Sequence, residues 1–172
     1  RNGFAIRLDI TMSFSTGDRL PDFDFTIMCN DGPAKMSTSE LCDGKTVVLF
    51  AVPGAFTPTC HANHMPGFVE HAEAIKEKGV DTIAVTTVND IHVTNAWEDA
   101  SKAKCKVVFL SDGNAEFAKA VGQDIDLGVA GMGVRSKRYS MIVKDGVVTS
   151  LNVEDNPGEA VASSASAILE QL

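Results

Sequence analysis

A chain of 172 residues, 44% of them hydrophobic, is long enough to fold as one domain around a buried core. Its 23 acidic residues outnumber its 15 basic residues, which argues against a nucleic acid or an anionic membrane as its partner. The sequence contains no apolar run of the length that crosses a bilayer. Composition therefore predicts one domain that binds neither nucleic acid nor a membrane.

The first eleven residues fit poorly with the pattern that follows them. They lack the apolar stretch and the small-residue cleavage site of a secretory signal. Met12 is a natural start for the folded part. We therefore expect residues 1–11 to be a leader or a disordered N-terminus, and residues 12–172 to form a single domain.

The first predicted elements are two short strands. Phe and Ile alternate with Asp and Thr over residues 23–27, which is the period of a half-buried strand. Residues 29–33 form a turn cluster that contains the Asp-Gly pair typical of hairpins. We expect a strand pair at this point.

A buried strand comes next. Residues 47–52 are continuously apolar, as expected for a strand with both faces covered, and Pro53 with Gly54 ends it. A short loop then leads to Cys60. Because this loop leaves the carboxyl end of a central strand, it is where a site is expected in an α/β fold.

Helical spacing begins at Cys60 and continues to about residue 78, with Pro66 predicting an irregular first turn. Unpaired backbone N–H groups and the positive end of the helix dipole stabilise an anion at such a position. The thiolate is the reactive form of a cysteine. The position of Cys60 therefore predicts a nucleophile.

The remaining chain alternates between strands and helices. We predict strands at residues 82–88, 106–110, 139–143 and 147–153, and helices at residues 93–103, 115–121 and 159–172. The glycine-rich residues 126–138 are predicted to form a loop. This order indicates an α/β fold with a central mixed sheet flanked by helices.

Several side chains near Cys60 have more than one interpretation. The Thr57 hydroxyl can donate to the sulfur or merely cap the helix. His61 and His64 suggest a Cys–His dyad, but a helical neighbour rarely points the right way, and His64 is better placed to orient the loop. A metal site formed by these three cysteine and histidine side chains is disfavoured.

Basic residues follow the glycine-rich segment. Its glycines do not have the order of the dinucleotide fingerprint, and a strand follows them instead of a helix. An arginine here could lie beside a thiolate and stabilise its charge. Spacing alone leaves both Arg135 and Arg138 open, and a solvated patch is the favoured interpretation for Arg135 and Lys137.

The four cysteines contain no Cys-x-x-Cys pair, which removes the usual dithiol motif and the usual zinc knuckle. A chain of this size does not need disulfide staples. We expect reduced thiols in a cytoplasmic protein, and Cys29, Cys42 and Cys105 to be ordinary packed or half-exposed residues.

The run Pro-Gly-Ala-Phe-Thr-Pro-Thr-Cys at residues 53–60 resembles the active-site loop of the peroxiredoxins, Pro-x-x-x-Thr-x-x-Cys. With His-Met-Pro-Gly-Phe at residues 64–68, it is similar to the peroxiredoxin 5 group, which includes the plant type II enzymes. Val-Asn-Asp at 88–90, Ala-Trp at 96–97 and residues 135–140 extend the resemblance, which covers nearly everything from Ser13 to Leu172.

The resemblance implies a thioredoxin-like fold and reduction of hydrogen peroxide and organic hydroperoxides without any cofactor or metal. It makes Cys60 the peroxidatic cysteine, whose thiolate attacks the O–O bond. It implies that Thr57 holds the thiolate and the peroxide oxygens, that Pro53 shields the pocket, and that Arg138 is the family arginine. The further candidate substrate-binding residues are Thr59, Gly54 and His64.

The chain departs from the family at the resolving cysteine. Plant type II members place it where this chain has Val85, and animal peroxiredoxin 5 places it where this chain offers only residues 162–164. We therefore expect one-cysteine chemistry, with glutathione and glutaredoxin as the first choice of reductant and thioredoxin as the second. Cys29, Cys42 or Cys105 as an unconventional resolver stays open.

The resemblance also implies a homodimer. A different class of function stays open as the alternative: a redox sensor or chaperone in which oxidation of Cys60 changes a binding surface and turnover is incidental. A thiol–disulfide exchange protein is disfavoured by the missing Cys-x-x-Cys.

Overall fold

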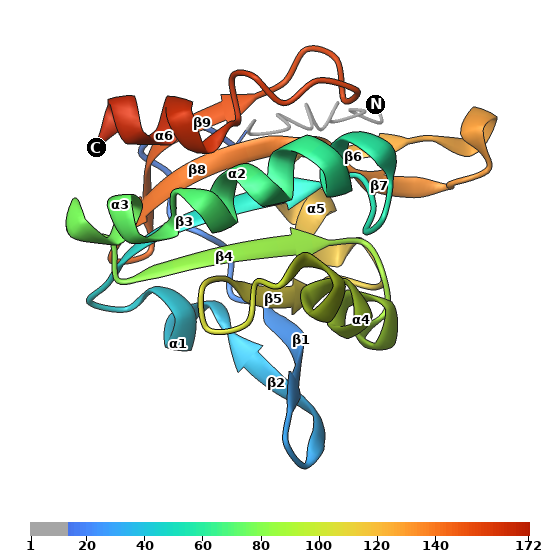
Figure 1. The fold of residues 1–172 in the computed structure, drawn as a ribbon, viewed down its shortest axis with the longest axis horizontal. Helices are drawn as coiled ribbons and strands as arrows, with labels where there is room; N and C mark the ends of the chain where they lie inside the picture. The colour runs from blue at the N-terminus through green and yellow to red at the C-terminus, as the bar shows by residue number, and fades with distance from the viewer. Residues whose placement is uncertain (1–13) are drawn as a thin grey trace, which may run out of the picture.

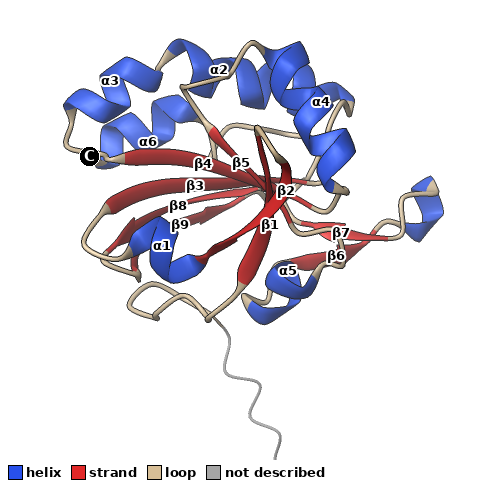
Figure 2. Cartoon of the chain, turned by 90° about the horizontal axis from the view of Figure 1, so that it is seen from below, coloured by secondary structure: helices blue, strands red, loops and turns tan. Residues whose placement is uncertain are grey.

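A mixed sheet with helices on both faces forms the described part of the molecule (Figures 1 and 2). The computed structural model describes residues 14–172, in which seven strands are ordered β2-β1-β5-β4-β3-β8-β9. The expected leader, residues 1–11, lies outside the described residues, so the proposed domain start stays a prediction.

The sheet strands are β1 (Asp24–Cys29), β2 (Gly32–Ser37), β3 (Thr46–Val52), β4 (Thr82–Thr87), β5 (Val108–Ser111), β8 (Tyr139–Lys144) and β9 (Val147–Val153). A separate hairpin pairs β6 (Asp124–Asp126) with β7 (Val134–Ser136). The helices are α1 (Thr38–Cys42), α2 (Met65–Glu70), α3 (Ala72–Glu77), α4 (Ile91–Ser101), α5 (Glu116–Ala120) and α6 (Ala165–Gln171), with a π-helix at Cys60–His64 and a 3-10 turn at Gly128–Ala130.

Strand β3 separates two cores. It runs parallel to β4 and antiparallel to β8, and every residue from 47 to 52 is fully buried. Val48, Phe50 and Val52 point into the core under α2, α3, α4 and α6. Val47, Leu49 and Ala51 point into the core under α1 and α5. Two covered faces explain why the run is continuously apolar.

Most predicted elements are confirmed, including the first hairpin, the strands at 82–87 and 108–111, and the hairpin of β8 and β9. Helix α4 begins two residues earlier than predicted because Asp90 accepts from the backbone N–H groups of His92 and Val93. Helix α1 was not predicted; it has only five residues and depends on a capping box between Ser37 and Glu40.

Three predictions on helix and loop boundaries were wrong. The glycine-rich segment is a hairpin, and its three-residue strands are too short to show alternation. The last helix begins at Ala165 and not at residue 159, because the Ser164 side chain caps it by accepting from the Ala167 N–H. The helix predicted for residues 60–78 is divided at His71 into α2 and α3.

The start of that helix has an unusual hydrogen-bond pattern. The Met65 N–H donates to the Cys60 carbonyl, a π-type bond one residue longer than in an α-helix. Pro66 follows directly, and proline removes a backbone donor and crowds the preceding turn. The predicted irregularity is therefore confirmed as a π-turn that includes the candidate nucleophile.

Candidate active site

Cys60 lies just beyond the carboxyl end of β3. After Val52 the chain turns through Pro53 and Gly54, and helical conformation begins at Pro58, so Cys60 is in the first helical turn. Its side chain is fully buried. The first N–H groups of a helix have no partner within the helix, and they favour negative charge at this position.

Two side chains donate hydrogen bonds to the sulfur. The Thr57 Oγ1 atom is 2.8 Å from the Cys60 Sγ, and the Arg138 Nη2 atom is also 2.8 Å from it. A buried anion is tolerated only when it is paired and hydrogen-bonded, and the guanidinium and the hydroxyl supply both conditions. This arrangement suits a thiolate.

The Thr57 hydroxyl has a second contact, with the Gly54 carbonyl oxygen at 2.7 Å. A hydroxyl carries one proton, so it can donate to only one of these two acceptors at a time. When Cys60 is a thiolate, the charged sulfur is the better acceptor. When the sulfur carries a proton, the hydroxyl can accept from it and donate to Gly54. Thr57 can thus serve both protonation states.

Arg138 reaches the sulfur from the neighbouring strand. Tyr139 pairs with Ala51, so the residue before β8 lies beside the end of β3. Arg138 is only 2% exposed. Its Nε donates to the Pro157 carbonyl at 3.0 Å, and its Nη1 lies 3.0 Å from the His64 Nδ1. Three fixed partners hold the guanidinium in one orientation.

His64 lies behind the arginine and is almost fully buried. Its Nε2 is 2.9 Å from the Ser163 carbonyl oxygen, which can only accept, so Nε2 carries the proton. Its Nδ1 must then accept from Arg138, which can only donate. Burial lowers the pKa of His64 from its ordinary 6.5 to about 3; the Ser163 hydrogen bond opposes this effect and the Arg138 charge adds to it. The imidazole is neutral.

A pocket of about 240 Å³ opens above this group. Thr57 and Arg138, the two donors to the sulfur, form part of its wall. The other lining residues are mostly apolar. They come from residues 53–60, here called the Cys60 loop, from the β6–β7 hairpin and from the segment after β9: Pro53, Pro58, Thr59, Leu127, Met132, Pro157 and Gly158. The pocket can bring a small molecule with a polar end and an apolar body to the donors.

The predicted site residues divide into two groups. Pro53, Thr57, Thr59 and Arg138 all line the pocket. The Thr59 hydroxyl also donates to the Gly158 carbonyl at 2.8 Å. His64, by contrast, does not line the pocket. It contacts Arg138, which does.

Gly54 is also away from the wall, because it is packed beneath Arg135. A Cβ at this position would lie 3.0 Å from the Arg135 Nη1 and 3.1 Å from the Thr57 Cγ2. Arg135 donates from Nε to the Met132 carbonyl and from Nη1 to the Pro53 carbonyl. The solvated-patch interpretation of Arg135 is therefore wrong: it ties the β6–β7 hairpin to the Cys60 loop.

His61 takes no part in a Cys–His dyad. Its Nδ1 lies 3.2 Å from the Trp97 Nε1, and its ring lies 5.6 Å from that of Phe56. Within residues 14–172, no group of three or more His, Cys, Asp and Glu side chains is arranged to hold a metal ion.

Sequence reasoning missed the segment that follows β9. Pro157, Ser163 and the buried Glu154 all contribute to the network around Arg138. Their spacing carries no motif, and a helix was predicted over part of the segment. The one available signal is a glutamate directly after an apolar strand, which is too common to use.

A thiol hydrogen-bonded to a hydroxyl and a guanidinium, at the carboxyl end of a central strand in a mixed sheet, indicates a thiol-dependent redox protein. The sequence matches the Redoxin family over residues 15–169. It is 45% identical over 167 residues to peroxiredoxin-2E, chloroplastic, of Arabidopsis thaliana, covering 95% of this chain and 71% of that protein. It is 43% identical over 159 residues to peroxiredoxin-2B of the same plant, covering 92% and 98%.

The structure is similar to that of reduced Prx3 in complex with hydrogen peroxide from Vibrio vulnificus. The TM-score is 0.87 at 44% sequence identity, and the match covers 91% of this chain and 98% of the other. The chain belongs to the Redoxin family and, within it, to the peroxiredoxins, which are thiol peroxidases. The predicted thioredoxin-like fold is confirmed with it.

Proposed function

We propose that Cys60 is the peroxidatic cysteine and that Thr57 and Arg138 are its catalytic partners. The observation that carries the proposal is the pair of 2.8 Å contacts to one buried sulfur from two side chains that line a pocket. Pro53 forms part of the pocket wall and excludes water from the thiolate. Thr59, Gly54 and His64 act in support: the first two shape the loop, and His64 orients the arginine.

The reaction begins with the peroxide in the pocket. The Cys60 thiolate attacks the terminal hydroperoxide oxygen with its electron pair, a sulfur–oxygen bond forms, and the O–O bond breaks. The sulfur is oxidised to a sulfenic acid, and the leaving oxygen departs as hydroxide or alkoxide and takes a proton from water. The charge that develops on this oxygen is stabilised by the Arg138 guanidinium. The apolar walls accept alkyl hydroperoxides as well as hydrogen peroxide.

The positions of the other three cysteines support an external resolving thiol. Strands β3, β4 and β5 run parallel, and Cys60 follows the carboxyl end of β3. Cys42 ends α1 shortly before β3, Cys105 shortly precedes β5, and Cys29 ends β1, which is antiparallel to β5. All three therefore lie near the opposite ends of these strands from Cys60.

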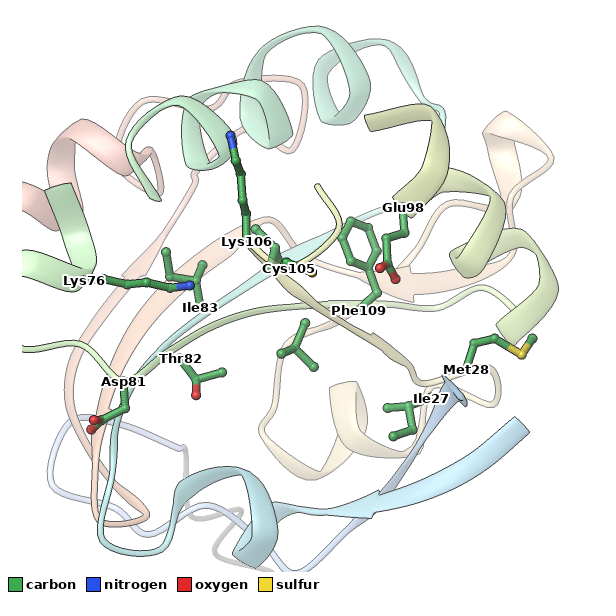
Figure 3. Close-up of a pocket in the computed structure, with 12 residues that line it drawn as sticks. Ile27, Met28, Lys76, Asp81, Thr82, Ile83, Glu98, Cys105, Lys106 and Phe109 are labelled. Carbon is green, nitrogen blue, oxygen red and sulfur yellow. The ribbon is translucent and has the colours of Figure 1, made fainter. Parts of the chain in front are cut away.

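The length of the strands separates them from Cys60. A six-residue strand spans about 20 Å, whereas a disulfide needs Cα atoms within about 7 Å. Figure 3 shows the opposite ends of the strands, where Cys105 lies at a pocket of about 310 Å³ with Lys106 beside it and Glu98 of α4 across from it. An internal disulfide to Cys60 would require part of the sheet to unfold.

We therefore propose that the sulfenic acid condenses with glutathione, releasing water and forming a mixed disulfide that glutaredoxin reduces; thioredoxin is the second choice. Because Cys60 is fully buried, a reductant needs the Cys60 loop to move outward. The hydrogen bond from Thr59 to Gly158 is one contact that this movement breaks.

We also propose a homodimer. Phe56, Val129 and Val134 are large apolar side chains that are 47%, 104% and 40% exposed, and they come from the Cys60 loop and the β6–β7 hairpin. A second copy of the chain that packs against both of these segments would bury them. Among residues 14–172, none of the helices has the length and apolar character to cross a bilayer. The free thiols suit a reducing compartment; the cytoplasm is our proposal, with a chloroplast as the alternative that the plant relative suggests.

Intact mass after a brief hydrogen peroxide pulse, with and without glutathione, tests this scheme. We expect one added oxygen without glutathione and one glutathione adduct with it, both located on Cys60. A loss of two hydrogens in the monomer would instead show an internal disulfide and overturn the external route. Peroxide consumption with glutathione and glutaredoxin must also be catalytic; absence of turnover with every reductant would favour the redox sensor.

A further inference from the structure

The segment after β9 approaches the active site from one side. Residues 155–164, here called the C-terminal strap, connect β9 to α6. Pro157 and Gly158 of the strap line the pocket. The Arg138 guanidinium uses the strap twice, directly through the Pro157 carbonyl and indirectly through His64 and the Ser163 carbonyl.

The strap is held from beneath by one carboxylate. The Glu154 Oε1 atom accepts from the Val161 N–H at 2.6 Å, from the Ser163 N–H at 2.8 Å and from the Ser163 hydroxyl at 2.9 Å. Glu154 is only 8% exposed and Ser163 is fully buried. Charge-assisted bonds of this kind are about twice as strong as neutral ones, and their number fixes the strap in one conformation.

Sheet register brings this carboxylate to the arginine. Tyr139 pairs with Val153 at the end of β8 and β9. One residue further along, the Glu154 N–H donates to the Arg138 carbonyl at 3.0 Å. The contacts therefore close into a ring. It passes from the Arg138 backbone to Glu154, then to Ser163, to His64, and back to the Arg138 guanidinium.

We infer that Glu154 is a positioning residue for the peroxidase reaction, acting through the C-terminal strap on the orientation of Arg138. This inference rests on the proposed role of Arg138. Two of the three guanidinium contacts, those other than Cys60, depend on carbonyl groups that the strap presents. Without the carboxylate, the Ser163 and Pro157 carbonyls are no longer held in position. The guanidinium is then no longer oriented toward the sulfur and the leaving oxygen.

The experiment compares Glu154→Ala, Glu154→Gln and Asp155→Ala. Oxidation of Cys60 by hydrogen peroxide is followed by intact mass in quenched samples, and labelling of Cys60 by monobromobimane is followed in parallel. We expect Glu154→Ala to slow oxidation by about tenfold to a hundredfold, because a displacement of about 1 Å in a catalytic group has effects of this size. Bimane labelling also needs the Cys60 thiolate but has no leaving oxygen for the arginine to stabilise, so it should slow much less than oxidation does.

Two variants serve as controls. Glu154→Gln keeps a carbonyl oxygen that can accept from Ser163, and we expect it to restore the oxidation rate to within about threefold of the unmodified protein. Asp155→Ala removes an exposed neighbouring carboxylate and should change neither rate. Protection of the buried Cys42 from the same label reports that each variant is folded.

The inference is overturned if folded Glu154→Ala is oxidised at the unmodified rate, or if Glu154→Gln is as slow as Glu154→Ala. If Glu154→Ala exposes Cys42, Glu154→Asp decides, because it keeps the charge but withdraws the carboxylate by one methylene; oxidation as fast as in Glu154→Gln would then refute the inference. Arg138→Ala is measured beside them. An undiminished oxidation rate in Arg138→Ala would remove the proposed role of the arginine itself.

Discussion

Cys60 and Cys42 are equally buried, with 0% and 1% of their surfaces exposed, but their surroundings are opposite in chemical character. Cys60 receives hydrogen bonds from a hydroxyl and a guanidinium. Cys42 ends α1 and packs in the core under α1 and α5. Burial raises the pKa of Cys42 to about 11, with the Asp43 charge adding to the effect and Lys45 opposing it.

The comparison shows that two equally buried thiols can have opposite surroundings. Removal from water disfavours the thiolate, and only directed donors reverse that preference. The two cysteines also lie at opposite ends of β3, one before its first residue and one beyond its last. Only the carboxyl end is close to the arginine that precedes β8.

Exchange of either thiol for a hydroxyl gives the largest expected contrast. Cys60→Ser should abolish peroxide reduction, because a serine hydroxyl is not ionised at neutral pH and cannot attack the O–O bond. Cys42→Ser, Cys29→Ser and Cys105→Ser should keep most of the activity in a glutathione-coupled assay. Loss of turnover in one of these three would show that it is a resolving thiol.

Alkylation of Cys42 in the native protein should be very slow. With its pKa raised to about 11, only about one molecule in a thousand carries a Cys42 thiolate at pH 8. Peptide mapping after a short exposure to iodoacetamide should find the exposed Cys29 labelled and Cys42 unlabelled. In denaturant both cysteines should react. Equal labelling without denaturant would contradict a buried Cys42 with a raised pKa.

Loss of the guanidinium should make Cys60 resemble Cys42. We expect Arg138→Ala to slow oxidation of Cys60 by about a hundredfold or more, the size of effect seen when an oxyanion donor is removed. Arg135→Ala is the matched control. Arg135 donates to the Met132 and Pro53 carbonyls. Its removal should therefore slow the oxidation of Cys60 far less, with both rates measured by rapid mixing. Comparable losses would refute the choice of arginine.

Removal of the second donor should have a smaller effect. Thr57→Val keeps the shape of the side chain but deletes the hydrogen bond to the sulfur, and we expect about a tenfold slower oxidation of Cys60. Thr57→Ser restores a hydroxyl and should recover most of the rate. If the valine variant reacts at the unmodified rate, the Thr57 hydroxyl has no part in the oxidation.

The last prediction concerns stability at low pH and not the rate of oxidation. His64 has a folded-state pKa lowered to about 3, against an ordinary 6.5 in the unfolded chain. Between these values the unfolded state binds more protons, so the stability contributed by His64 is present above pH 6.5 and is lost as the pH falls toward 3.

Urea unfolding at several pH values measures this contribution as the difference between the unmodified protein and His64→Asn. The difference should shrink as the pH falls. His92→Asn, at an exposed position in α4, is measured in the same way as the control for loss of a histidine. A difference that does not change with pH would contradict a buried, neutral His64.

Much of the fold was predictable because its signals are local. The apolar run of β3, the Asp-Gly turn between β1 and β2 and the Asp90 cap of α4 each lie within a few residues. Short elements escaped prediction, because α1 and the β6–β7 hairpin have too few residues to show a period. Residues 159–164 of the strap were predicted as helix because their hydrogen bonds to Glu154 join residues seven and nine positions apart in a loop that leaves no periodic signal.

The sequence by itself was enough to propose the nucleophile, because a thiol at the start of a helix that follows a buried strand lies beside backbone N–H groups that favour its anion. The eight residues at 53–60 also identified the family. Residue spacing left Arg135 and Arg138 open, and only the family resemblance favoured Arg138. The tertiary structure supplies the contact itself, since β8 register places Arg138, 78 residues away in sequence, 2.8 Å from Cys60. It also decided that His64 holds the arginine and that Glu154 holds the strap. The contacts of Arg138 with Cys60 and His64 depend on the pairing of β3 with β8, and the spacing of residues along one chain does not encode that pairing.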